Sequence, residues 1–225
     1  MRNKSIKKIH VSLAGGICTA VLVLVGLARP ENPDPVLAYY WANAAEAART
    51  IDPVSSGMVY VLTARTFCHR TGPGGNIAAT DTVMCDYFYT GDNLDSLKVE
   101  EGKEACAKTT DLSYPYVFDN VYELSLFPND TGGADLAIGL ISDSAATAQP
   151  DGLVIIDRKD YAMRNLYLFY PEKEGYRRFT RSFRFVEFEG YLFPDSVWEV
   201  GTRLGVFSSE NYRTETGVTE IRIIP

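Results

Sequence analysis

From Gly57 to the C-terminus, the sequence alternates with period two in short runs that clusters of Gly, Asn, Asp and Pro separate. Strand-like runs occur at 58–69, 82–90, 114–127, 134–142, 152–157, 164–170, 176–189, 191–200, 203–208 and 218–224. About ten consecutive strands with short turns and no long helix between them predict an antiparallel meander. Such a meander curls into a barrel or part-barrel.

One amphipathic helix precedes the strands, at 35–51. It opens with Pro35, is rich in Ala and places its large apolar residues at three- and four-residue spacing, until Asp52-Pro53 ends it. The segment 93–110 is the one other place where a helix or a flap is expected. Neither face of the runs at 58–69 and 82–90 is plainly polar, so both sides of the sheet are expected to be covered. The helix is one cover; the other is ordinary packing, a bound apolar ligand or a partner.

Residues 1–28 are set apart from the rest. Four cations in MRNKSIKK precede twenty mostly apolar residues without a charge. This pattern is typical of an export signal cleaved before Arg29 and predicts a periplasmic or otherwise exported protein. The alternative is an uncleaved anchor in the inner membrane over residues 9–28. The predicted domains are thus the signal or anchor at 1–28, a linker at 29–34 and a single domain at 35–225.

The charge of the chain argues against two classes of partner. Removal of residues 1–28 takes away four positive charges and no negative ones, so the net charge falls from −7 to −11. An acidic protein of this kind is not expected to bind nucleic acid or anionic lipid head groups. Membrane contact is therefore expected only through the N-terminal segment, if it stays uncleaved.

The sequence carries few signs of an enzyme. His69 is the only histidine beyond the N-terminal segment, and no GxSxG, HExxH, CxxC or EF-hand pattern occurs. We therefore expect no catalytic residues, no metal and no cofactor.

Three cysteines lie beyond the N-terminal segment, in a chain expected in an oxidising compartment. A hairpin centred between Asn76 and Ile77 would place Cys68 opposite Cys85. Two alternatives follow, a cross-strand disulfide between Cys68 and Cys85 or two buried small hydrophobic residues. Cys106 would then be an odd thiol.

In the stretch EGYRRFTRSFRFVEFEG at 174–190, an arginine lies on the same face of the predicted strand as several aromatic residues. Phe179, Arg181, Phe183 and Phe185 share one face, and the apolar phase then changes, which predicts a bulge near 185–186. Arg181 is interpreted in two ways. It lies at the rim of an apolar cavity and grips a head group or a flap carbonyl, or it snorkels out to solvent, or it stacks on aromatic rings and pairs with a Glu. Trp198, in the last strands, faces a ligand or a packed helix.

In their order, several segments resemble the outer-membrane lipoprotein-sorting family, which includes the periplasmic Lol carrier and its receptor. They are the export signal, LAYYWANAAEAARTI, GMVYVLTART, YELSLFPNDTGGADLAIGLI, VIIDRKDYAMRNLYLFYP and the tail GYLFPDSVWEV followed by YRTETGVTEIRI. The resemblance spans about residues 35–225. The absence of a lipobox argues against the lipid-anchored receptor form.

The resemblance implies a mostly β (α+β) fold, a curved antiparallel half-barrel with helices over its concave face. It also implies a non-enzymatic protein whose apolar cavity holds an acyl chain, lipid or lipoprotein moiety, with Arg65 and Arg181 both candidates to grip the lid. The candidate ligand-binding residues are Arg65, Tyr87, Tyr89, Arg181, Phe183, Phe185 and Trp198. The alternative function is a membrane-anchored interaction or structural module of the envelope, which holds a protein partner and no lipid.

Overall fold

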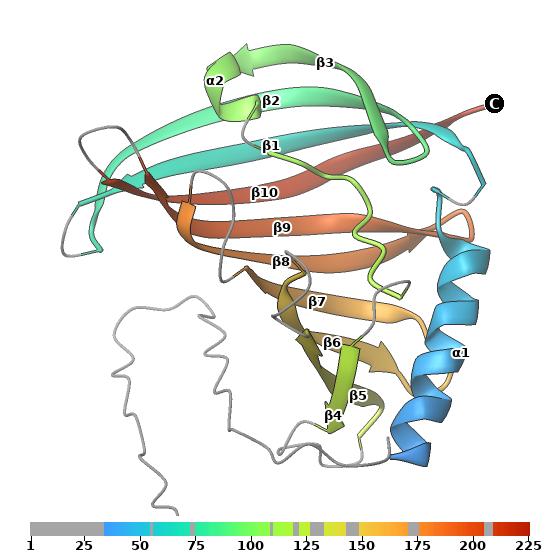
Figure 1. Ribbon diagram of the computed structural model, residues 1–225. Coiled ribbons are helices and arrows are strands. Elements are labelled where there is room, and N and C mark those ends of the chain that lie inside the picture. Colours follow the sequence, from blue (N-terminus) through green and yellow to red (C-terminus); the bar gives the residue numbers. More distant parts are fainter. Residues whose placement is uncertain are drawn as a thin grey trace, which may run out of the picture.

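The computed structural model describes the greater part of the predicted domain (Figure 1). The described residues are 34–54, 56–72, 75–108, 110–118, 122–126, 133–142, 149–170, 176–204 and 209–225, without the side chains of residues 176, 177 and 209. The predicted signal or anchor at 1–28 and nearly all of the linker lie outside this range, so these domain boundaries stay predictions.

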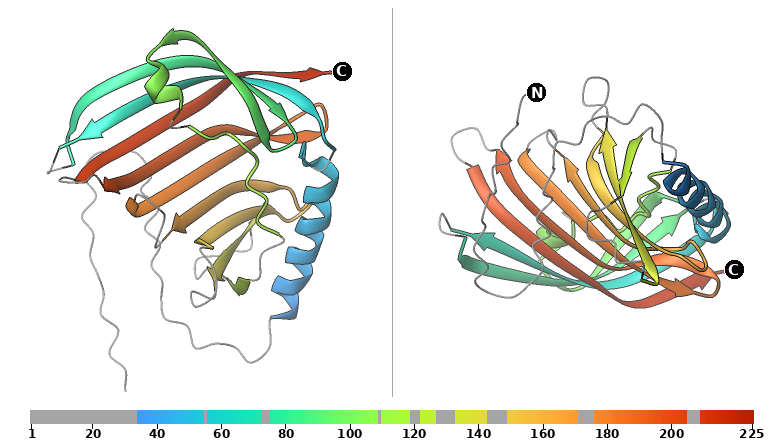
Figure 2. Two further views of the ribbon diagram at one scale, coloured as in Figure 1. Left: turned by 45° about the horizontal axis from the view of Figure 1, so that its top comes forward. Right: turned by 90° about the horizontal axis from the view of Figure 1, so that it is seen from below.

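The described residues form one ten-stranded antiparallel sheet and two helices. The strands are β1 (Val59–Thr71), β2 (Ile77–Thr90), β3 (Asn93–Gly102), β4 (Tyr122–Leu126), β5 (Asp135–Ser142), β6 (Asp151–Asp157), β7 (Met163–Tyr170), β8 (Tyr176–Phe188), β9 (Tyr191–Leu204) and β10 (Ser209–Ile224). Their order is β3-β2-β1-β10-β9-β8-β7-β6-β5-β4, so β3 and β4 are the two edges of an open sheet. The sheet curves strongly (Figure 2), and the predicted half-barrel of mostly β structure is confirmed.

The core lies on the concave face of the sheet. In β5 and β6, buried and partly exposed residues alternate along the whole strand. Because side chains of a strand point alternately to its two faces, one face of each strand carries the buried set. The largest fully buried side chains include Tyr60, Tyr87, Tyr89, Phe183 and Phe193. The register shifts between Arg184 and Phe185, which confirms the predicted bulge in β8.

Helix α1 (Pro35–Ile51) forms where the sequence predicts it. The Asp34 side chain accepts a hydrogen bond from the Val36 amide at 2.8 Å, and Pro35 occupies the first turn, where its missing N–H costs nothing. The helix buries Leu37, Ala44 and Ala48. It stands along one end of the strands, beside β4 and β9 (Figure 1), and so closes that end of the concave side.

The chain crosses the concave face between β3 and β4. These strands are opposite edges of the sheet, so the segment between them has to traverse the molecule. It does so as the short helix α2 (Glu104–Ala107) and then the irregular residues 110–118, which we call the strap (Figure 1). The strap forms no ladder with the sheet, yet Leu112, Tyr114, Val117 and Phe118 are all buried.

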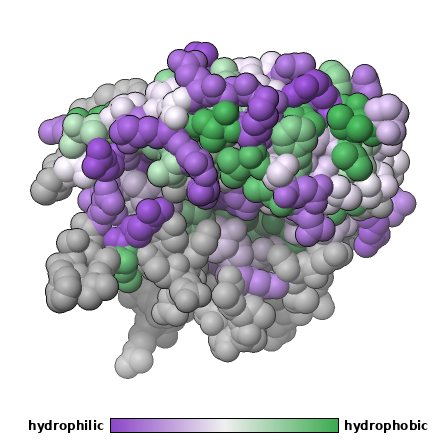
Figure 3. All heavy atoms as spheres, turned by 90° about the horizontal axis from the view of Figure 1, so that it is seen from above, coloured by the Kyte–Doolittle hydropathy of each residue, from purple (hydrophilic) through white to green (hydrophobic). Residues whose placement is uncertain are grey.

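Two predicted segments are corrected here. Residues 93–102, predicted as helix or flap, are the edge strand β3, and residues 114–118, predicted as strand, belong to the strap. An edge strand with little buried surface needs no apolar alternation, and charged side chains protect it from pairing with other chains. Seen from the side of β3 and α2, the described surface is mostly hydrophilic (Figure 3). The apolar residues of the strap are buried against the core. In the sequence they recur among less apolar residues, as they would in a strand with one buried face.

The last strands also divide differently from the prediction. Residues 203–204 end β9, and β10 begins at Ser209 instead of at 218. The first half of β10 was missed because its buried positions are Thr214 and Thr216, which do not mark an apolar face in the sequence.

A disulfide joins Cys68 of β1 to Cys106 of α2, with a Cα–Cα distance of 5.9 Å, and Cys85 is a buried free thiol. The disulfide between Cys68 and Cys85 that the sequence allowed is therefore wrong, because Cys68 is bonded to Cys106. The β1–β2 register places Asp81 opposite Cys68 and Ala64 opposite Cys85, a shift of four residues from the predicted hairpin. The bond fastens the root of the strap to the sheet.

We predict that the disulfide contributes substantially to stability. It closes a loop of sequence separation 38, for which loop-closure entropy gives about 4 kcal/mol at most. Reduction should therefore lower the free energy of unfolding of the wild type in urea by about 2–4 kcal/mol. The variant Cys85→Ala should respond to reductant as the wild type does, and Cys68→Ala/Cys106→Ala should not respond. An equal response of the three proteins would contradict this assignment.

Candidate functional site

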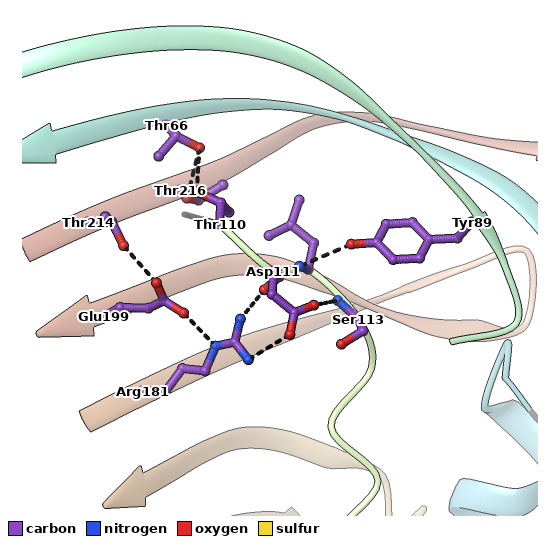
Figure 4. Close-up of polar contacts among 10 residues, drawn as sticks. Thr66, Tyr89, Thr110, Asp111, Ser113, Arg181, Glu199, Thr214 and Thr216 are labelled. Carbon is purple, nitrogen blue, oxygen red and sulfur yellow. Dashed lines mark hydrogen bonds and ion pairs between the residues drawn. The ribbon is translucent and has the colours of Figure 1, made fainter. Parts of the chain in front are cut away.

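The strap is held to the concave face by a buried arginine of the sheet (Figure 4). Arg181 of β8 donates from Nη2 to the backbone carbonyl oxygen of Asp111, and its Nη1 lies 3.1 Å from Asp111 Oδ2. The Arg181 side chain is only 9% exposed, whereas that of Asp111 is 56% exposed. The buried Arg181 guanidinium thus connects β8 to the strap. We call this contact the latch.

Glu199 of β9 compensates the charge of Arg181 inside the core. Its Oε1 lies 2.8 Å from Arg181 Nε, and its side chain is 5% exposed. Because Arg181 and Glu199 are opposite each other in the β8–β9 ladder, the register itself brings them together. The Arg181 guanidinium also lies over the Phe183 ring, 5.0 Å from its centroid. Arg181 thus contacts a carbonyl of the strap and also stacks on Phe183 and pairs with Glu199. An apolar cavity and a head group beside Arg181 stay predictions.

Threonines extend the polar region beside the latch. Thr214 Oγ1 donates to Glu199 Oε2 at 3.3 Å, and the hydroxyl groups of Thr66 and Thr216 lie 2.9 Å apart. Thr110, at the start of the strap, donates to Thr66 at 3.5 Å. These partners satisfy hydroxyl groups that would otherwise be buried without hydrogen bonds.

Opposite charges and hydrogen bonds hold the latch in its ionised form. The Asp111 side chain is more than half exposed, and the loss of part of its hydration acts to raise its pKa; the charge of Arg181 and the hydrogen bonds from Ser113 outweigh this effect, so the pKa is lowered. Burial acts to lower the pKa of Arg181, but Glu199 and Asp111 outweigh it, so this pKa is raised. Both groups are therefore charged at neutral pH.

Tyrosines of the sheet bind the strap and its root as neutral hydrogen-bonding groups. Tyr89 Oη accepts from the Leu112 amide at 3.1 Å, and Tyr87 Oη donates to the Ala107 carbonyl at 3.4 Å. Burial raises the pKa of Tyr87 to about 12 and raises that of Tyr89 as well. Aromatic contacts add to these bonds: Tyr114 of the strap packs on Phe185, and Trp41 of α1 packs on Phe118 at 4.7 Å between centroids.

Five of the residues predicted to bind a ligand lie together on the concave face. Tyr87, Tyr89, Arg181, Phe183 and Phe185 are all buried beneath or beside the strap. Whether they contact a ligand stays a prediction.

The other two predicted residues point to the outer face. Arg65 lies between Ala64 and Thr66, which are buried, so alternation turns its side chain outward. Trp198 lies between the buried Val197 and Glu199 and is turned outward for the same reason. Of the two candidate lid-gripping arginines, Arg181 is the one in contact with the strap.

Sequence reasoning missed Asp111 and Glu199. Glu199 lies in the run Val197-Trp198-Glu199-Val200. The one indication of its position was that it is two residues from Val197 and so shares its face of the strand. Asp111 is exposed in a segment without periodicity and left no signal. The described residues hold no group of three or more His, Cys, Asp or Glu side chains that could bind a metal ion. The Nδ1 atom of His69 lies 2.8 Å from Thr80 Oγ1.

A search of solved structures finds three crystal structures that match most of this chain, each with a TM-score below 0.5. One is described as an outer membrane lipoprotein-sorting protein domain from Vibrio parahaemolyticus, with 10% identity, 81% of this chain and 91% of that chain covered, and a TM-score of 0.45. The second is a LolA superfamily protein from Nitrosomonas europaea, with 7% identity, coverage of 84% and 94%, and a TM-score of 0.38. The third is a DUF1329 family protein from Desulfovibrio piger, with 12% identity, coverage of 83% and 92%, and a TM-score of 0.42.

No protein-family model and no curated protein matches the sequence. Neither helix in the described part of the chain is both long and apolar enough to cross a bilayer.

We predict that Arg181 and Glu199 act on stability as a pair. Arg181→Leu should lower the free energy of unfolding by about 3–5 kcal/mol, because it leaves Glu199 charged and buried. Arg181→Leu/Glu199→Leu should recover most of this loss in urea titrations. Arg184→Leu, which removes an ion pair with Asp195 on the outer face, should cost less than about 1 kcal/mol. Equal losses for the two single variants would contradict a special role of Arg181.

We predict that acid opens the latch. The pKa of Asp111 in the folded protein is below its ordinary value of 3.8, so its stabilising contribution is complete above that value. The contribution is lost as the pH falls through the lower, folded value. The Leu112 amide resonance should move in NMR spectra recorded below pH 3.8, and Asp111→Asn should abolish this step. A wild-type step that persists in Asp111→Asn would assign it to another group.

Proposed function

We propose that the protein is an exported, non-enzymatic carrier that holds an acyl chain, lipid or lipoprotein moiety between the sheet and the strap. The observation that carries the proposal is the strap itself. Its apolar side chains occupy the concave face, yet it forms no ladder with the sheet and is attached by the latch and, at its root, by the disulfide.

The exchange of the strap for a ligand would be nearly balanced in free energy. Burial of apolar surface is worth roughly 25 cal/mol per Å2 whether the surface belongs to Leu112 or to a methylene chain. The strap and an acyl chain therefore compete for the same surface of Tyr89, Phe183 and Phe185. A small term such as the latch then sets the population of the open state.

The disulfide limits how far the strap can move. Cys106 stays bonded to β1, so the strap would swing from its root and release Leu112 and Tyr114 while α2 keeps its place. Asp111 is the first strap residue with an exposed side chain beyond this root, and its bonds to Arg181 would have to break first.

A substitution of Asp111 weakens the latch and leaves the buried charge of Arg181 paired with Glu199. Asp111→Ala removes the exposed carboxylate, while Arg181 keeps Glu199. Because opening then costs less, we expect the variant to bind a pyrene-labelled fatty alcohol about two- to fivefold more tightly than the wild type, measured by fluorescence titration. Asp195→Ala, which removes an ion pair on the outer face, is the matched control and should bind as the wild type does.

Extraction of the protein purified from membranes should also recover acyl chains. If neither the wild type nor Asp111→Ala binds the probe and no acyl chain is extracted, the carrier proposal is wrong. The envelope interaction module predicted as the alternative would then be favoured.

A further inference from the structure

A polar pocket lies at the end of the concave face opposite the closing helix α1. Its volume is about 430 Å3, within the range of small-molecule sites. Its lining residues are Cys68, His69, Arg70, Asp81, Lys103, Ala105, Cys106, Arg203, Glu210, Tyr212, Arg213 and Thr214. The disulfide at the root of the strap therefore forms part of its wall.

The pocket is positively charged in an acidic protein. Arg213 alternates with the buried Thr214, so its side chain is turned to the outer face. The other charged lining residues are Arg70, Lys103 and Arg203 against Asp81 and Glu210, a net charge of +1, compared with −7 for the whole chain. Lys103 forms an ion pair with Asp81, and Arg213 forms one with Glu215 outside the pocket. Among the described residues, Arg70 forms no ion pair. Its charge and that of Lys103 act on Asp81, whose pKa is lowered chiefly by the hydrogen bond from Lys103.

A glycine and a tyrosine position the second arginine of the pocket. Gly201 and Tyr212 are opposite each other in the β9–β10 ladder. A Cβ on Gly201 would lie 2.8 Å from Tyr212 Cε1, so the absence of a side chain lets the Tyr212 ring lie across β9. The Arg203 guanidinium lies over this ring, 5.4 Å from its centroid. Stacking holds a guanidinium plane in one orientation, which favours bidentate binding of phosphate or carboxylate.

The polarity of the concave face changes steadily away from the pocket. Along β1 the inward-facing residues are Arg70 and Cys68 at the pocket, Thr66 beside the latch, and then Ala64, Leu62 and Tyr60 in the apolar core. An amphiphile with its head group in the pocket would place its chain toward the surface that the strap covers.

We infer that this pocket binds a phosphate or carboxylate group through Arg70 and Arg203. The group belongs either to the head group of an amphiphile whose chain lies under the strap or to a free anion. The first source rests on the proposed function, and the second does not.

The test compares three probes on the wild type and on Arg70→Gln/Arg203→Gln. The probes are inorganic phosphate, dodecyl phosphate below its micellar concentration, and dodecanol. Binding is followed by NMR shifts of pocket amides for phosphate and by calorimetry for the other two. We expect the double variant to bind both phosphates at least about tenfold more weakly, because each arginine contributes a charge-assisted hydrogen bond, and to bind dodecanol unchanged.

Two further variants keep the result interpretable. Arg178→Gln/Arg184→Gln removes the same charge from exposed positions of β8 on the outer face and should bind all three probes as the wild type does. Arg70→Gln alone removes a side chain without an ion pair in the described structure and serves if the double variant unfolds.

The outcomes separate the two proposals. Phosphate binding that the double variant loses, with no binding of dodecanol and no tighter binding of dodecyl phosphate than of phosphate, supports a free-anion site and contradicts the carrier function. If the double variant binds dodecyl phosphate as tightly as the wild type does, the proposed anion site is wrong and the carrier function stands. Absence of binding by both phosphates overturns the pocket as well.

Discussion

The crossing of the chain between the two edges of the sheet is the constraint on which the rest of the structure depends. In a meander, most successive strands are neighbours, and their connections stay at the ends of the sheet. Strands β3 and β4 are instead the opposite edges. The segment that joins them has to pass over a face, and the concave face is where its apolar residues are buried. The strap, its root disulfide and the latch all follow from this topology.

Two interactions of different strength hold the strap: a covalent disulfide at its root and an ion pair at the latch. The disulfide is permanent in an oxidising compartment and limits the motion of the root. The Arg181–Glu199 pair is buried and belongs to the sheet, whereas Asp111 is largely exposed. An ion pair with one exposed partner contributes little free energy, so the strap is held in place without being fixed. The proposed carrier function depends on this difference between a permanent root and a weak latch.

The sequence predicted well wherever one face of an element is apolar. Helix 35–51, the antiparallel curved sheet and the bulge near Phe185 all follow from the spacing of apolar residues, and all are present. Prediction failed where that spacing carries no information. The edge strand β3 is polar, the start of β10 buries threonines, and the strap buries apolar residues without being a strand. The partner of Cys68 was predicted from an assumed turn, and a register four residues away changed it.

The sequence by itself determined the class of fold, the position of the helix and the face of β8 on which Arg181, Phe183 and Phe185 lie, because alternation and helical spacing are local properties. Only the tertiary structure decided that Arg181 meets Asp111 and Glu199, that Cys68 meets Cys106, and that Arg65 and Trp198 point outward. These contacts depend on strand register and on the path of the strap. Both are set by the packing of residues far apart in the chain, and no local pattern encodes them.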